Sequence, residues 1–190
     1  LHLAFVLDFW DRLCTISDVS LHFYCDRPWT YQNGPVSPEK CNLQRGSDLG
    51  RRILHCFEEI QRCGYERVLI VGSDSPTLPL GYLEEGLERL RHTDAVLGPT
   101  EDGGYYAVGC RQVQPHMFDG VRWSSTCTRA DTCRAFAREG LQFELLPNWY
   151  DVDTAGDLER LAVELDLPSA KEFQYTDAWF DSHQPFNLRR

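Results

Sequence analysis

The chain has 190 residues, of which 42% are hydrophobic and 25% charged, and its formal net charge is −10. This length and composition are typical of one globular domain with its own core. A nucleic-acid partner is not expected, because such interfaces are basic and the basic residues here are mostly single or paired. No apolar run is long enough to cross a membrane and no signal peptide is visible, so we expect a cytoplasmic protein without a membrane partner.

The eight cysteines show no C-x-x-C spacing, which argues against a zinc knuckle or a thioredoxin-type motif. Several fall on predicted core faces, where a free cysteine behaves as a small hydrophobic residue. We therefore expect reduced thiols rather than a disulfide framework.

Predicted helices and strands alternate along the chain. Apolar residues recur at helical spacing over residues 3–13, and alternation over 21–25 indicates a strand. Segment 26–46 is rich in Pro, Asn, Gly and Gln and is predicted to be a long loop. A helix follows, with Ser47 as its expected N-cap and Gly64 at its end.

The strongest strand signal is the apolar run Val68–Val71, which is typical of a central strand buried on both faces. A helix over 80–90 and a second buried strand over 95–98 come next. Further strands are predicted at 105–109 and 143–145, and further helices at 128–139 and 154–165, the last opened by a capping box at Thr154. This alternation predicts a layered α/β domain with a mostly parallel, mixed sheet.

We expect one domain over residues 1–167 and a C-terminal extension over 168–190. The extension is aromatic but shows no clear periodicity, and it contains Phe173, Tyr175, Trp179, Phe180 and Phe186. Such a segment is expected to pack on the body of the domain or on a second subunit, so a homodimer is one expected assembly.

A carboxylate and two hydroxyls follow the strand Val68–Val71, in the run Gly-Ser-Asp-Ser-Pro that contains Ser73 and Asp74. Ligands of open α/β sheets bind at the carboxyl ends of strands. A carboxylate at that position can bind Mg²⁺ or Mn²⁺ and present the ion to a diphosphate. The alternative is that Asp74 caps the following turn, because Ser-Asp-Ser-Pro is also good turn chemistry.

A second acidic pair, Asp151 and Asp153, lies between the last predicted strand and a helix N-terminus. We expect only one of the two to face the site. Capping is the alternative for Asp153, since a helix N-terminus favours a carboxylate. Together with Asp74, one of these residues would form the two-carboxylate clamp that a metal–diphosphate site requires.

Two glycine-bearing segments complete the candidates. Paired glycines after Asp102 let the backbone approach a ligand, although Asp-Gly-Gly is also typical of a hairpin turn. At the entry to the second helix, backbone N–H groups and the arginines of segment 45–51 could contact a phosphate or a base. Ordinary capping explains Asp48 equally well, and Trp123 could line a pocket or belong to the core.

Five ordered motifs, QRGSDLGRR, VLIVGSDSPTLP, VLGPTEDGGYYAVG, FDGVRWSS and LLPNWYDVDTAGDLERL, resemble one bacterial family. It is the glycosyltransferase-A-like family often labelled selenodomain-associated transferase 1, related to nucleotide-diphospho-sugar transferases and nucleotidyltransferases. The resemblance covers about residues 1–165. It implies a Rossmann-like three-layer α/β/α sandwich and a metal-dependent transferase that moves a glycosyl or nucleotidyl group from a nucleotide-activated donor to a small acceptor.

The resemblance also implies roles for individual residues. Asp74 and Asp153 would bind Mg²⁺ or Mn²⁺, and Asp102 is the candidate catalytic base. Nucleotide binding is expected of Gly46, Asp48, Gly50, Arg51 and Ser73. Substrate binding is expected of Gly103, Gly104, Tyr105 and Trp123.

One departure from the family pattern bears on activity. Family members open with a strand and a basic K-x-P-x-x-G-x-x-K-T-R-L loop, whereas this sequence starts at the helix that should follow them. Either the sequence is a fragment, or the protein has lost its first strand. A lost strand would leave a sheet edge exposed or differently covered, and would remove the charges that offset a triphosphate. The alternative function is therefore a non-catalytic nucleotide- or partner-binding protein with a degraded transferase site.

Overall fold

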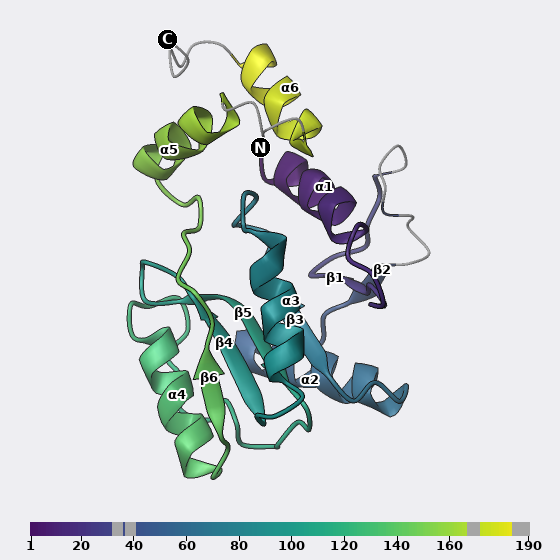
Figure 1. The fold of residues 1–190 in the computed structure, drawn as a ribbon, viewed down its shortest axis with the longest axis vertical. Coiled ribbons are helices and arrows are strands. Elements are labelled where there is room, and N and C mark those ends of the chain that lie inside the picture. Colours follow the sequence, from purple (N-terminus) through teal and green to yellow (C-terminus); the bar gives the residue numbers. More distant parts are fainter. Residues whose placement is uncertain (32–35, 37–40, 167–171, 184–190) are drawn as a thin grey trace.

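The computed structural model describes residues 1–31, 36, 41–166 and 172–183. Its helices are α1 (His2–Leu13), α2 (Leu49–Arg62), α3 (Leu80–Arg89), α4 (Thr128–Arg138), α5 (Ala155–Leu165) and α6 (Gln174–Ser182). Its strands are β1 (Phe23–Cys25), β2 (Cys41–Leu43), β3 (Val68–Val71), β4 (Ala95–Pro99), β5 (Tyr105–Cys110) and β6 (Phe143–Leu145) (Figure 1). None of the described helices has the length and apolar character needed to cross a bilayer.

The main sheet has the strand order β3-β5-β4-β6. Strand β5 pairs antiparallel with both β3 and β4, whereas β4 and β6 pair parallel. Three strands therefore run in one direction and β5 opposes them, which confirms the predicted mixed sheet. The carboxyl ends of β3, β4 and β6 consequently point to the same edge.

Helices cover both faces of this sheet, because its strands alternate apolar side chains between two cores. On one face α2 and α4 pack through Phe57 and Phe136 against Leu97 and its neighbours. On the other face α3 packs through Leu83 against Val96. Helix α3 lies in front of the sheet in Figure 1. The predicted three-layer α/β/α sandwich is confirmed.

The remaining three helices gather at one end of the molecule (Figure 1). Apolar residues of α1, α5 and α6 form a separate core that includes Phe5, Leu161 and Phe180. Buried Asp8 of α1 accepts hydrogen bonds from the backbone N–H groups of Tyr175 and Thr176, at 2.9 and 2.7 Å. The described part of the C-terminal extension thus packs on the body of the domain, while Phe186 lies outside the described residues.

Two local predictions are wrong by a few residues. The N-cap of α2 is Asp48, whose carboxylate accepts from Arg51 N at 2.9 Å, and Ser47 donates its hydroxyl to Asp48 instead of capping. Residues 41–43 of the predicted long loop form β2, which pairs parallel with β1. By contrast, the capping box of Thr154 at the start of α5 is present as predicted.

The expectation of reduced thiols throughout is also wrong for one pair. Cys25 and Cys41 form a disulfide. The parallel register places Cys25 opposite Leu43 and Cys41 opposite Phe23, so the two sulfurs meet diagonally across the small sheet. The other six cysteines carry no disulfide.

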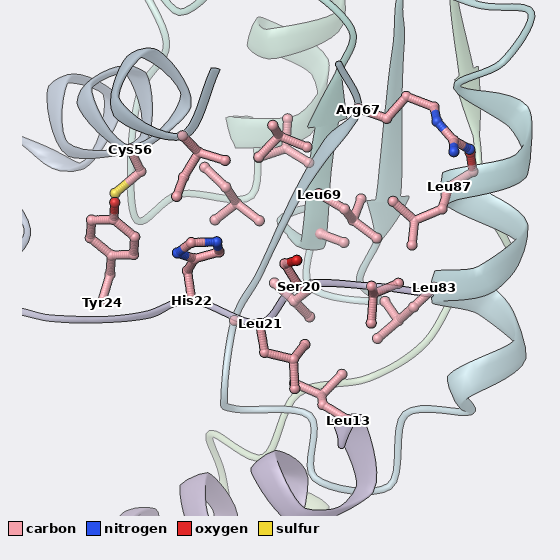
Figure 2. Close-up of a pocket in the computed structure, with 18 of the residues that line it drawn as sticks. Leu13, Ser20, Leu21, His22, Tyr24, Cys56, Arg67, Leu69, Leu83 and Leu87 are labelled. Carbon is pink, nitrogen blue, oxygen red and sulfur yellow. The ribbon is translucent and has the colours of Figure 1, made fainter. Parts of the chain in front are cut away.

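Strand β3 lies at an edge of the sheet, not at its centre as predicted. Its outer side faces a cavity of about 990 Å³. Figure 2 shows Leu69 of β3, Leu87 of α3 and Cys56 of α2 around this cavity, with His22 of the segment before β1 also on its wall.

Candidate functional site

The acidic segments meet at the edge where the three codirectional strands end. Beyond β6 the chain continues alongside β4, because Trp149 N donates to Pro99 O at 3.1 Å and Thr100 forms a parallel bridge with Trp149. Val152 N then donates to the backbone oxygen of Asp74 at 2.8 Å. Loops after β3, β4 and β6 are thereby joined by backbone contacts.

Three carboxylates from two of these loops form one group. Asp102, Asp151 and Asp153 each offer an oxygen, and these oxygens lie within 4.8 Å of one another. The expectation that only one of the last two faces the site is wrong, because side chains two residues apart in extended backbone point to the same side. Asp151 is the member that the sequence-based metal assignment leaves out.

Asp102 stands at the tip of the hairpin between β4 and β5. Its Oδ1 accepts from Thr100 Oγ1 at 2.5 Å and from Gly104 N at 2.8 Å. Gly103 has φ +94°, and a Cβ there would lie 2.2 Å from Thr126 O, so no other residue fits without a shift. The hairpin alternative for Asp-Gly-Gly is thus confirmed, and the same turn directs Asp102 into the carboxylate group.

Mutual repulsion and burial act on these carboxyl groups. Burial raises the pKa of Asp151 to about 6, with further contributions from the charges of Asp102, Asp153 and Asp74. The pKa of Asp153 is raised as well, first by burial and then by Asp74 and Asp102. A bound cation would relieve this repulsion.

The donor set fits a hard divalent ion. Mg²⁺ and Mn²⁺ prefer oxygen ligands, and Mg²⁺ in particular is usually held by a few carboxylates together with substrate phosphates. Asp102, Asp151 and Asp153 supply carboxylate oxygens at close range from two separate loops.

Asp74, the first predicted metal ligand, lies beside this group without belonging to it. Its Oδ1 is 3.0 Å from Nε2 of His2, which also lies 3.0 Å from Ser73 Oγ. The hydrogen bond to Asp74 raises the pKa of His2. The first residue of α1 therefore reaches the candidate site, and no spacing in the sequence marks it, because its partners are distant along the chain.

Several residues predicted to bind nucleotide or substrate line a second cavity, of about 330 Å³. Asp48, Gly50 and Arg51 contribute from the start of α2, and Trp123 contributes from the segment before α4. Gly50 packs directly on the indole, since a Cβ at this position would lie 2.8 Å from a Trp123 ring atom. The structure thus brings these four candidates together, although the sequence assigned them to two different roles.

The other candidates lie elsewhere. Gly46 precedes α2 with φ +150° and does not line the second cavity, and Ser73 lies with Asp74 on the wall of the larger one. The ring of Tyr105 contacts that of Trp123 edge to face, with centroids 6.4 Å apart, and its hydroxyl is buried. Tyr105 therefore supports Trp123 from the core side.

Comparisons with known proteins agree with the fold. A sequence model of the family described as "Uncharacterized protein conserved in bacteria (DUF2064)" matches residues 18–125. A crystal structure from Desulfovibrio desulfuricans G20, described as a "putative nucleotide-diphospho-sugar transferase", is 29% identical with a TM-score of 0.76. The alignment covers 95% of this chain and 83% of that one. None of the curated proteins matches the chain.

Proposed function

We propose that this protein, which belongs to the DUF2064 family, is a divalent-cation-dependent transferase that uses a nucleotide-diphospho-sugar donor. The observation that carries the proposal is the group formed by Asp102, Asp151 and Asp153 at the carboxyl edge of the sheet. Ligands of open α/β sheets bind at this edge. The similarity to a structure described as a nucleotide-diphospho-sugar transferase supports the donor class.

In this proposal Asp102, Asp151 and Asp153 would hold Mg²⁺ or Mn²⁺ at the place where the donor diphosphate binds. The ion would supply positive charge where the leaving diphosphate gains negative charge. Asp102 would then serve as an ion ligand rather than as the catalytic base that the sequence suggested. The protein's own contribution is to hold donor and acceptor in place.

The second cavity is the proposed binding place for another part of the substrates. Trp123 offers an aromatic ring on which a flat group can stack, and Arg51 offers a guanidinium suited to phosphate. Asp48 and Gly50 line it at the N-terminus of α2. This cavity and the carboxylate group are linked through Tyr105, which contacts Trp123 and follows the hairpin tip.

The alternative, a non-catalytic protein with a degraded site, receives less support. In a site that has lost its function, we would not expect carboxylates from two loops to remain within 4.8 Å of one another. Mutual repulsion disfavours that arrangement while all three groups are charged, and a bound cation would offset it.

Calorimetric titration with UDP-, GDP-, ADP- and CDP-sugars, with and without Mn²⁺, tests the proposal. The variants are Asp102→Asn and Asp151→Asn, and the control is Glu139→Gln, an exposed carboxylate at the end of α4. We expect one donor class to bind only with Mn²⁺, in the wild type and the control but in neither aspartate variant. Donor binding of equal affinity with and without Mn²⁺ would contradict the cation site. If the folded wild type bound none of the donors, the non-catalytic alternative would be favoured.

A further inference from the structure

Arg160 of α5 contacts the neighbours of two site carboxylates. Its Nη1 donates to both carboxylate oxygens of Glu101, at 3.1 and 3.2 Å, and Glu101 directly precedes Asp102. Its guanidinium carbon lies 3.6 Å from the ring centroid of Tyr150, which directly precedes Asp151. One side chain thus bridges the hairpin tip after β4 and the segment after β6.

The Tyr150 side chain, on which the Arg160 guanidinium lies, is itself held in place. Its side chain is only 2% exposed. Its hydroxyl donates to Glu164 Oε2 at 2.8 Å and lies 3.2 Å from Thr77 Oγ1 in the loop after β3. Glu164 also lies 3.6 Å from Arg160 Nε, so the ring and the guanidinium share an anchor on α5.

A contact between the two loops helps to keep Asp102 close to Asp151 and Asp153. Like charges favour separation, yet Asp102 must stay within 4.8 Å of Asp151 and Asp153 for all three to share one ion. The backbone joins this hairpin tip to the segment after β6 through Glu101 N, which donates to Trp149 O at 3.1 Å, and to the start of α4 through Arg129 N, which donates to Gly103 O at 3.0 Å. Arg160 adds a side-chain contact at the same residue through Nη1, and its planar guanidinium also lies over the Tyr150 ring, a contact that a lysine ammonium does not reproduce.

We propose that Arg160 is a positioning residue that holds the hairpin tip bearing Asp102 against Asp151 and Asp153. The affinity of the cation site then depends on a side chain that does not touch the ion. This inference rests on the proposed function. Removing a partner that orients metal ligands typically weakens metal binding by about 10- to 100-fold.

Mn²⁺ titration followed by electron paramagnetic resonance tests this role without any donor or acceptor. The variants are Arg160→Ala, Arg160→Lys and Glu101→Gln. The matched control is Arg62→Ala, because Arg62 is an exposed arginine paired with a glutamate four residues away on α2, as Arg160 is on α5. Thermal unfolding of each variant verifies that it is folded, and Glu101→Gln weakens the same contact by removing its negative charge from an exposed side chain.

We expect Arg160→Ala and Glu101→Gln to weaken Mn²⁺ binding by about tenfold or more. Arg160→Lys should recover little of the loss, and Arg62→Ala should bind like the wild type. The double variant Arg160→Ala/Glu101→Gln should bind no more weakly than Arg160→Ala, because both changes remove one contact.

Wild-type affinity in folded Arg160→Ala and Glu101→Gln would overturn the positioning role and leave the cation site standing. Full recovery in Arg160→Lys would also overturn it, since charge alone would then account for the effect. If the wild type bound no Mn²⁺, the proposed function and this inference would both be overturned. This outcome is distinguishable from the others because it concerns the wild type and not the variants.

Discussion

Asp151 lies where the charges of three other carboxylates act together. Burial and the charges of Asp102, Asp153 and Asp74 raise its pKa to about 6. In the unfolded chain the group returns to an ordinary pKa near 4. Because the folded pKa is the higher one, the folded protein binds more protons between these values. Without a cation, its stability therefore falls as the pH rises from about 4 to about 6.

This sign makes Asp151→Asn a stabilising change in cation-free protein at pH 7. We expect a gain on the order of 1 kcal/mol, after discounting the pKa shift for the solvent that screens a half-exposed group. The gain should disappear near pH 4, where Asp151 is protonated. Urea unfolding in chelator at both pH values measures it, with Glu139→Gln as the unchanged control. An equal effect at both pH values would contradict the assignment.

At the residue scale, the sequence locates acidic segments better than it locates contacts. Asp102, Asp151 and Asp153 each follow a strand, so the pattern identifies them as candidates. Whether they meet depends on how the chain after β6 continues alongside β4 through Trp149, and no local pattern encodes that pairing. The position of His2 at the site could not be predicted either, because its contacts with the loop after β3 arise only from the packing of α1.

Helix α6 is held to α1 by a buried carboxylate. Asp8 accepts from two backbone N–H groups in the first turn of α6, where a helix has no internal acceptors. Burial raises the pKa of Asp8, and these hydrogen bonds oppose that effect. The contact therefore acts as a cap supplied by another element.

Truncation of this cap should loosen α6 from the domain. We expect Asp8→Ala to lower the free energy of unfolding by roughly 2–4 kcal/mol, because one buried and one half-buried N–H group lose their partner. Hydrogen exchange should show faster exchange of the Tyr175 and Thr176 amides. Glu159→Ala, an exposed change on α5, is the control, and unchanged exchange in Asp8→Ala would show that α6 docks independently of this carboxylate.

At the element scale, periodicity predicts most helices and strands within a residue or two. It fails for β2, whose three residues form a strand only because β1 lies beside them. It also misplaces β3, since an apolar run looks the same at a sheet edge that faces a cavity and at a sheet centre. Helix α6 has no clear amphipathic pattern in the sequence. Its position depends on contacts with Asp8 and with the core around Phe5, which periodicity does not reveal.

The molecule as a whole carries a net charge of −10, part of it concentrated in one carboxylate group. A ligand that binds only the folded state stabilises it by mass action. We expect Mn²⁺ at about 100 times its dissociation constant to stabilise the fold by about 2.7 kcal/mol at pH 7. Thermal unfolding with increasing Mn²⁺ measures the shift, which Asp102→Asn should abolish. An unchanged melting temperature in the wild type would contradict a folded-state cation site.

For the molecule as a whole, the sequence predicts that helices cover both faces of the sheet, because strands that bury both faces need helices on both sides. The gathering of α1, α5 and α6 at one end does not follow from it. Those contacts join residues near opposite ends of the sequence, and pattern analysis over short windows contains no information about them.

The contact between Asp8 and Thr176 spans 168 positions of the chain. A ribosome adds roughly 5–20 residues per second, so α1 emerges on the order of ten seconds or more before its partner helix is made. During that interval Phe5 and its apolar neighbours have no α6 to cover them. Helix α1 therefore cannot complete its packing until α6 has been made.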